Sequence, residues 1–271
     1  MRTHSRFHPA SRRTSSADHL ALQSDQAAGY DDLLRRWVAG EDSAMASVML
    51  EDQVIVPAGI ETLEQFRRWT RSRTFPKTGR IDFIAGCIEV DLSPEEFFSH
   101  GGPKEAIART LGPIVYEQQL GYLRIDNIRV ASPAADLSCE PDVVLLSDAS
   151  LDSGRVRMIP ARRGGSDSCL ELEGGPDLVV EVISKSSVGK DTRRLPRAYF
   201  AAGVRELWLI DARGERLEFQ ILTRGKARFR RVLPDRSGTM ASSVIPCRFR
   251  FVRERNTRGR WVYTLEHRPL T

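Results

Sequence analysis

The chain has 271 residues, of which 41% are hydrophobic and 28% are charged, a composition typical of a water-soluble globular protein. No apolar run approaches the roughly 20 residues needed to cross a bilayer, and the N-terminus lacks the apolar core of a secretory signal. The net charge of +5 and the pI of about 9.2 suit a polyanionic partner, although an arginine-rich proteome explains them equally well. We expect a cytoplasmic protein without a membrane partner.

Cysteine and histidine are too sparse to build a zinc site. The four cysteines lie far apart without a CxxC spacing, which favours buried thiols in a reducing compartment over disulfides. Three of the five histidines fall within the first 19 residues, which leaves only His100 and His267 for the folded part. A catalytic metal would therefore rest on carboxylates, whose oxygens favour Mg²⁺ or Mn²⁺.

The N-terminal quarter is predicted to form appendages. Residues 1–27 are polar and lack hydrophobic periodicity, so we expect a disordered basic tail. Residues 28–47 contain an amphipathic stretch, and residues 61–72 predict a short helix with Trp69 on its apolar face. We assign residues 28–75 to a helical N-terminal extension in which Trp69 is a packing residue.

Beyond this extension the pattern changes to short strands and two longer helices. Residues 81–92 predict a hairpin that turns at Gly86, and residues 103–119 predict a helix. A second helix is predicted at about 189–202, where Gly203 suits the left-handed residue that ends many helices. Further strands are predicted at residues 123–130, 142–146, 156–159, 169–172, 178–183, 206–211, 216–222, 227–233, 245–252 and 260–266.

This order of elements predicts an α/β fold: a mixed sheet flanked by helices, with a β-rich C-terminal continuation. We place the core domain at residues 76–215 and the continuation at residues 216–271. The unbroken apolar run within residues 206–211 is typical of a strand in the interior of a sheet.

Two carboxylates stand on strands that otherwise have core composition. Asp142 begins one such strand, and Glu181 lies in the middle of the run Leu178–Ile183. An ionised carboxylate there is costly unless a metal, a cation or hydrogen bonds compensate it, and a single buried acid is more often paired with an arginine. Two acids on strands of one sheet supply the convergent oxygens that a hard divalent cation needs. We therefore predict Asp142 and Glu181 as catalytic metal ligands.

A lysine is expected beside such a pair, because phosphodiester hydrolysis needs an activated water and compensation of the growing negative charge. The usual arrangement places Glu and Lys at positions i and i+2 of one strand face, but Ile183 occupies position i+2 from Glu181. Lys190, which follows a bend at the start of the next helix, is the predicted substitute. A solvated lysine at a helix start is an equally good interpretation. Asp191 is expected to have a structural role in the first helical turn.

Three other polar features are expected to be structural. Asp177 is interpreted as a strand-entry residue at the opposite end of the strand that carries Glu181. His100 is predicted to hydrogen-bond locally, with a phosphate contact as the alternative. The arginine-rich stretch at residues 253–260 is predicted to be a solvated turn, again with phosphate contacts as the alternative.

These residues, in this order, resemble the Uma2 family, which has a PD-(D/E)xK-like restriction-endonuclease fold. The resemblance covers the chain from about Arg80 to Asp211. It rests on an ordered set of fragments: Ile81-Asp-Phe-Ile-Ala-Gly, Leu92-Ser-Pro, His100 at a helix start, Cys139-Glu-Pro-Asp, Gly175-Pro-Asp-Leu-Val-Val-Glu-Val-Ile-Ser, Lys190-Asp-Thr and Tyr199-Phe-Ala-Ala-Gly-Val-Arg-Glu-Leu-Trp-Leu-Ile-Asp.

The resemblance implies that Asp142 and Glu181 are the acidic pair and that Asp82, where the family usually has Glu, is an additional metal-binding acid. Cys87 stands where the family often has Gly-Glu, and Leu195 stands where many members have a lysine. A branch of the family uses the Lys-Asp-Thr form, and this chain resembles that branch. The implied activity is a Mg²⁺- or Mn²⁺-dependent endonuclease acting on DNA. Restriction enzymes of this fold often act as dimers, so a homodimer is left open, although no interface is legible in the sequence.

Two classes of function stay open at this point. The first is the DNA endonuclease, with Asp142 and Glu181 on the metal and Lys190 assisting. The second is a nucleic-acid-binding or regulatory module that keeps the fold without catalysis, which the missing strand lysine allows. A purely structural interaction protein, with Trp37 and Trp69 on a partner-binding face, has little support.

Overall fold

The structure is a computed structural model that describes residues 48–50, 54–161 and 168–270. The chain divides into two compact units, residues 1–59 and residues 60–271. In the first unit the described residues form an antiparallel pair of strands, β1 (Val48–Leu50) and β2 (Val54–Val56). The predicted tail at residues 1–27 and the amphipathic stretch at residues 28–47 lie outside the described residues.

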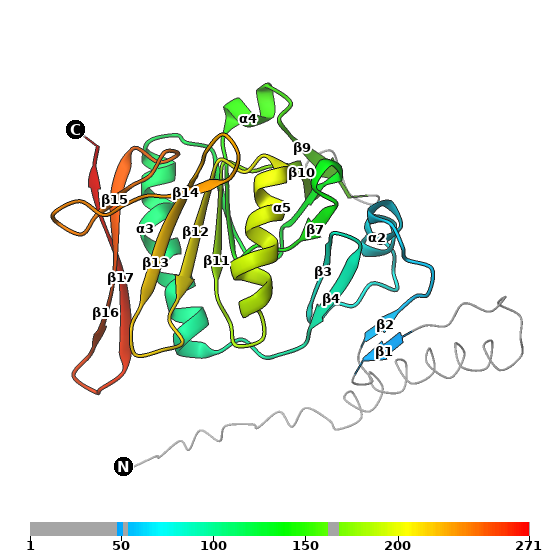
Figure 1. Cartoon of the computed structure of the whole chain (residues 1–271), viewed down its shortest axis with the longest axis horizontal. Coiled ribbons are helices and arrows are strands. Elements are labelled where there is room, and N and C mark those ends of the chain that lie inside the picture. Colours follow the sequence, from blue (N-terminus) through cyan, green and yellow to red (C-terminus); the bar gives the residue numbers. More distant parts are fainter. Residues whose placement is uncertain (1–47, 51–53, 162–167, 271) are drawn as a thin grey trace, which may run out of the picture. The chain divides into compact units, whose positions relative to one another are not determined.

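The second unit is built around a six-stranded mixed sheet, here called the central sheet (Figure 1). Its only parallel pair among the described strands is β11 with β12, and its other neighbours are antiparallel. In spatial order the strands are β14 (Phe229–Arg231), β13 (Glu218–Arg224), β12 (Glu206–Asp211), β11 (Leu178–Val182), β8 (Val143–Leu146) and β5 (Tyr122–Ile125).

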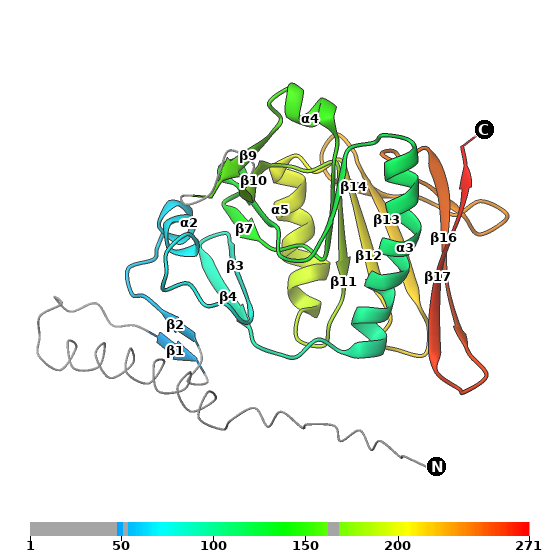
Figure 2. The ribbon, with the colours of Figure 1, turned by 180° about the vertical axis from the view of Figure 1, so that it is seen from behind.

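A second six-stranded mixed sheet and a small antiparallel sheet complete the β structure. The second sheet has the order β4 (Cys87–Asp91), β3 (Arg80–Ile84), β7 (Leu137–Cys139), β6 (Arg129–Ser132), β10 (Cys169–Gly174) and β9 (Val156–Pro160). The small sheet consists of β15 (Met240–Ala241), β16 (Cys247–Arg255) and β17 (Trp261–Pro269). The long hairpin β16–β17 lies beside helix α3 (Gly102–Glu117) when the molecule is seen from either side (Figures 1 and 2).

Side chains of β11 point alternately to the two faces of the central sheet. Leu178, Val180 and Val182 pack into one core together with α3 and the β16–β17 hairpin. The side chains between them face the opposite way, because successive residues of a strand point to opposite faces. On that face Val179 packs against helix α5 (Leu195–Ala202) and the second sheet. Glu181 has the same parity as Val179, so its carboxylate points toward α5.

The short helix α2 (Leu63–Thr70) forms as predicted for residues 61–72. The Thr62 hydroxyl accepts the backbone N–H of Gln65, and the Gln65 side chain accepts the N–H of Thr62, which closes a reciprocal cap. The Trp69 side chain is buried and packs edge-on against Phe66, with ring centroids 5.9 Å apart. Trp69 is therefore a packing residue, as expected.

The mixed α/β fold with a β-rich C-terminus is confirmed, but one predicted strand was wrong. Residues 123–130 form no single strand: they end β5, turn, and enter β6 in the other sheet. Asp126 and Asn127 cause the break, with φ values of 52° and 54° in the left-handed region that Asp and Asn tolerate better than most residues. The turn places the Asp126 carboxylate near Arg80 and Lys104.

Other differences concern the ends of elements. A π-helical turn precedes each of the two predicted helices. Phe97–Gly101 precedes α3, and Lys190–Arg194 precedes α5 and falls inside the helix predicted at about 189–202. Strands β1, β2, β7 and β15 and the short helix α4 (Asp148–Asp152) were not predicted. Strands β1 and β2 lie within residues 28–75, for which only helical structure was expected. The predicted domain division stays a prediction; its boundary at residues 215 and 216 falls between β12 and β13, which pair along their length. Among the described residues, no helix is long and apolar enough to span a membrane.

Gly203 gives a direct test of how α5 ends. Its φ is 95°, and a Cβ placed there would meet no atom within 4 Å, so a side chain would cost backbone strain alone. Gly203→Ala should lower the free energy of unfolding by about 1 kcal/mol. Gly189 is the matched control, because it has equal space but a φ of −67°. Gly189→Ala should be neutral or stabilising in urea denaturation; equal losses in both variants would refute this explanation.

Candidate active site

The pairing of β11 with β8 brings the two predicted metal-binding acids together. The antiparallel register pairs Leu178 with Leu145, Val179 with Val144 and Val180 with Val143. Continuing that register by one residue places Glu181 opposite Asp142. Directly opposed residues of antiparallel strands have Cβ atoms about 5 Å apart. Both acids are buried, with exposed fractions of 0% for Asp142 and 2% for Glu181.

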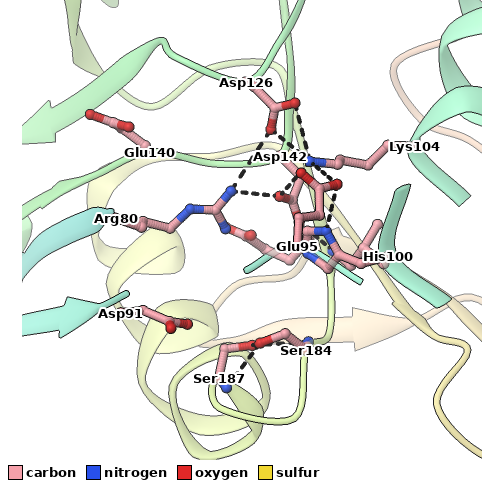
Figure 3. A network of polar contacts seen from close by, with 12 residues as sticks. Arg80, Asp91, Glu95, His100, Lys104, Asp126, Glu140, Asp142, Ser184 and Ser187 are labelled. Carbon is pink, nitrogen blue, oxygen red and sulfur yellow. Dashed lines mark hydrogen bonds and ion pairs between the residues drawn. The ribbon is translucent and has the colours of Figure 1, made fainter. Parts of the chain in front are cut away.

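Asp142 is compensated by one backbone group and one cation. Its Oδ2 accepts the N–H of Val182 at 2.7 Å, which also locks the end of β8 onto β11. Its Oδ1 accepts a hydrogen bond from Nη2 of Arg80 at 2.8 Å (Figure 3). Arg80 is half-buried, and although burial alone would lower its pKa, Asp142 and then Glu181 raise it. The guanidinium therefore stays charged.

Glu181 is the acid with the least compensation. The Tyr199 hydroxyl, from α5, donates a hydrogen bond to its Oε1 and also lies 3.3 Å from the Cys139 sulfur. Burial, followed by the charges of Asp142 and Asp191, raises the pKa of Glu181 well above its ordinary value, and Arg80 and Lys190 only partly oppose this. A carboxyl group in such surroundings gains much from an additional cation.

Lys190 lies inside the cluster, paired with Asp82. Its Nζ is 2.7 Å from Oδ2 of Asp82, and both side chains are buried. The other Asp82 oxygen accepts the N–H of Glu140 at 3.2 Å. Burial would lower the pKa of Lys190, but Asp82, Asp191 and Glu181 outweigh it and raise that pKa. The interpretation of Lys190 as a solvated lysine therefore does not hold, whereas a catalytic role stays a prediction.

Asp191 is a fourth buried acid beside Asp82, Asp142 and Glu181, although only a structural role in the first helical turn was expected for it. It accepts a hydrogen bond from the Ser187 hydroxyl. Burial raises its pKa from 3.8 to about 6, with Asp142 adding to the rise and Lys190 opposing it. The four acids Asp82, Asp142, Glu181 and Asp191 thus share one electrostatic environment.

A second layer of charged side chains surrounds Asp142 on the cleft side (Figure 3). Lys104, on the first turn of α3, has its Nζ 3.0 Å from Asp126 and 2.6 Å from Glu95. Nδ1 of His100 lies 2.9 Å from Glu95, which is the local hydrogen bond predicted for this histidine. Its other ring nitrogen is 3.6 Å from Oδ2 of Asp142, so His100 also belongs to the site.

A cleft of about 780 Å³ opens beside these residues. One wall comes from the segment that follows β4 and includes Glu95, Ser99 and His100, and another from the serine-rich loop at residues 184–187 that follows β11. Arg80 lines the cleft, so the charged group on Asp142 is reachable from outside. The cleft is large enough for a mononucleotide-sized part of a ligand.

The carboxylate oxygens of this site are suitable ligands for a hard divalent cation, but they are not arranged around a common point. Carboxylate oxygens are the preferred ligands of Mg²⁺ and Mn²⁺, and Glu181 is short of positive charge. However, in residues 48–50, 54–161 and 168–270, no three His, Cys, Asp or Glu side chains converge closely enough to hold a metal. Arg80 and Lys190 occupy Asp142 and Asp82 instead. A cation at Asp142 and Glu181 therefore requires Arg80 to move.

Several members of the site were missed by sequence reasoning, and two of them carried a readable signal. Arg80 stands two residues before Asp82 on β3, so both share one strand face. Lys104 lies three and seven residues before Ile107 and Leu111, which places it on the buried face of α3. Asp126 carried no such signal, because a turn set its position.

Asp177 shows what a structural buried acid looks like in this protein. Its carboxylate accepts the N–H of Ser147 at 2.8 Å, the hydroxyl of Ser150, and Arg155 at 2.6 Å. Burial would raise its pKa, but the hydrogen bonds from Ser147 and Ser150 and the charge of Arg155 lower it. In contrast to Glu181, this acid is fully compensated by the protein, which agrees with its interpretation as a strand-entry residue.

Asp177→Asn should therefore destabilise the fold in a pH-dependent way, by about 2–3 kcal/mol at pH 7. Because the folded-state pKa is lowered, the carboxylate stabilises the fold above its unfolded value of 3.8, and this is lost as pH falls through the folded pKa. Urea denaturation at pH 7 and pH 3 measures the difference between wild type and variant. A difference that does not shrink at pH 3 would contradict the assignment.

No curated protein matches the chain. One similar solved structure is the crystal structure of a "putative nuclease belonging to DUF820" from Anabaena variabilis, which is 16% identical, covers 65% of this chain and 89% of that chain, and has a TM-score of 0.43. The family model of Uma2, described as "Putative restriction endonuclease", matches residues 63–253. This match spans more than half of the sequence, and the chain therefore belongs to the Uma2 family.

Proposed function

We propose that this protein is a metal-dependent endonuclease that hydrolyses phosphodiester bonds in DNA. The family supplies the general class, a nuclease of the restriction-endonuclease type. The observation that carries the proposal is the cross-strand placement of two buried carboxylates, Asp142 and Glu181. Glu181 is incompletely neutralised, and Arg80, which pairs with Asp142, lines an open cleft. The basic net charge of the chain agrees with a polyanionic substrate.

Asp142 and Glu181 would hold the cation, with Asp82 as the additional acid. When bound, a Mg²⁺ or Mn²⁺ ion supplies Lewis-acid stabilisation of the phosphoryl oxygens and an activated water. Lys190, held by Asp82 inside the acidic cluster, would offset negative charge that develops on the phosphate. Tyr199 would keep one oxygen of Glu181 in place by donating its hydroxyl hydrogen bond.

Arg80 has a double role in this proposal. Without a divalent cation it neutralises Asp142, which keeps two adjacent acids from repelling each other. Were Asp142 to hold a divalent cation instead, the Arg80 guanidinium, which lines the cleft, would be available to a phosphate oxygen pair that suits its planar group. Arg80 would thus move its charge from the protein to the substrate.

A second candidate function is a nucleic-acid-binding or regulatory module without catalysis. Three observations favour it: Ile183 and Leu195 occupy the positions where a lysine is common, and Arg80 already fills the space beside Asp142. In such a protein the Arg80–Asp142 pair would be permanent. Homodimer formation and a cytoplasmic location stay predictions under either function.

Cleavage assays distinguish these functions. Wild type should cleave plasmid or single-stranded DNA with Mg²⁺ or Mn²⁺, and Asp142→Asn or Glu181→Gln should each lower the rate about 100-fold or more, because charge stabilisation at the phosphate is lost. Asp177→Asn is the matched control, a buried acid away from the cluster, and should keep its rate below its unfolding temperature. Cleavage that persists in both site variants would refute the site assignment.

The state of Arg80 can be tested without any substrate. In Arg80→Met the cation on Asp142 is removed, so the metal-free protein should unfold at a lower temperature than wild type, while Mn²⁺ should stabilise it more strongly. We expect an apparent Mn²⁺ affinity about tenfold higher, a gain of roughly 1.4 kcal/mol. Thermal denaturation with increasing Mn²⁺ measures both effects. If Mn²⁺ stabilises neither protein, the non-catalytic module is favoured.

A further inference from the structure

A group of aromatic and arginine side chains lies where the start of α3 meets the β16–β17 hairpin. This aromatic–arginine surface consists of Phe97, Phe98, Trp261, Arg253, Arg255 and Arg260. The guanidinium carbons of Arg255 and Arg253 lie 3.8 Å and 4.2 Å from the centre of the Trp261 ring. Arg260 lies 5.9 Å from the centre of the Phe98 ring. None of these residues belongs to the acidic cluster.

The aromatic side chains of this surface line a hollow next to the cleft beside Asp142. The hollow has a volume of about 570 Å³ and is lined by Phe97, Phe98, Trp261 and Tyr263, among others. Glu95 lines both this hollow and the cleft beside Asp142, so the two lie next to each other. The floor is firmly built, because a Cβ at Gly102 would lie only 2.9 Å from the Tyr263 ring.

Phe97 is the residue that packing does not explain. Its side chain is 78% exposed, although it directly follows the acidic turn that leads into α3. It meets the ring of Phe98 edge-on, with centroids 5.0 Å apart, so a face of the ring is left to solvent. The arginines over Trp261 are adequately explained as surface stacking, whereas an exposed phenylalanine costs solubility and offers a stacking face.

The arginines of the β16–β17 hairpin favour an anionic ligand. Residues 247–261 contain six arginines and a single acid, Glu254. Two of these arginines, Arg248 and Arg250, are paired with Asp235 and Glu266. In the described part of the chain, Arg253 donates to the carbonyl oxygens of Ala212 and Gly214, and Arg255 donates to that of Gly259. These contacts orient the guanidinium groups without neutralising them. The nearby acids Glu95 and Glu105 are paired with Lys104 and Arg109.

We propose that the aromatic–arginine surface binds a single-stranded segment of the DNA substrate, next to the phosphate that lies in the acidic cleft. Exposed rings bind bases that are free to unstack, and arginines bind the phosphates between them. A duplex offers its phosphates to the arginines but keeps its bases stacked inside, so Phe97 would gain nothing from it. This inference rests on the proposed function and makes it more specific: the preferred substrate has a single-stranded region beside the cleavage point.

The test measures binding without cleavage. Fluorescence anisotropy with a labelled oligo-dT and a duplex of equal length, in EDTA, compares wild type with Phe97→Ala and Arg255→Ala. Phe97→Ala should weaken oligo-dT binding about tenfold or more and change duplex binding less than threefold. Arg255→Ala should weaken both and reduce the salt dependence by about one phosphate contact.

Two control variants keep the result specific. Tyr116→Ala removes an 85% exposed aromatic ring at the far end of α3, and Arg236→Ala removes an exposed arginine in another turn. Both should bind oligo-dT like wild type. The inference is overturned if wild type does not bind oligo-dT, if Phe97→Ala binds it normally, or if Phe97→Ala weakens duplex binding equally.

The binding test and the cleavage test can give opposite results. If oligo-dT binding depends on Phe97 but no divalent metal supports cleavage, the endonuclease proposal is wrong and the binding surface stands. If wild type cleaves DNA and Phe97→Ala neither binds nor cleaves single-stranded DNA differently, the proposed function stands and the surface is wrong. The two results use different variants and different readouts.

Discussion

The antiparallel pairing of β11 with β8 places two buried carboxylates, Asp142 and Glu181, on neighbouring strands, and much of the surrounding structure compensates for this. Two negative charges at that separation repel strongly where water is excluded. A protein can remove the cost by protonation, by cations of its own or by a bound metal. Here burial and neighbouring acids raise the pKa of Glu181, and Arg80 neutralises Asp142, so the first two remedies are both in use.

The contrast with Asp177 shows that this strain is local. Asp177 is as deeply buried as Asp142, yet hydroxyl, backbone and arginine donors satisfy it and lower its pKa. The fold is therefore able to stabilise a buried carboxylate completely. At the β11–β8 pair it does so incompletely for Glu181, and Arg80, which pairs with the neighbouring Asp142, lines an open cleft. Such a combination of perturbed acids and a cleft is characteristic of functional sites.

The sequence was informative wherever one residue's surroundings follow from strand or helix periodicity. The alternation within Leu178–Ile183 predicted that Glu181 is buried on one face, and Gly203 predicted the end of α5. The same logic, applied to cations, would have found Arg80 two residues from Asp82. Periodicity could not predict the break at Asp126 and Asn127. The chain turns there because β5 and β6 join different sheets, and the sheet that a strand joins is set by tertiary structure.

The composition of the site beyond the acids depended on tertiary structure. Glu95, Lys104 and Asp126 meet around Asp142 from three different elements: the segment before the π-helical turn, the first turn of α3, and the turn between β5 and β6. Lys190 was identified from its position after a bend. Its partner Asp82 lies 108 residues away, and the two come within hydrogen-bond distance because α5 packs against the second sheet. Spacing along the sequence does not predict such contacts.

The central claim is that the space between Asp142 and Glu181 accepts a divalent cation in place of Arg80. Crystals of the protein soaked in Mn²⁺ test it directly, because the metal gives an anomalous difference peak at its own position. We predict one peak within ligand distance, about 2.2 Å, of oxygens from both carboxylates, with the Arg80 guanidinium moved away from Asp142. A structure with Arg80 still on Asp142 and Mn²⁺ absent or bound elsewhere would contradict the claim.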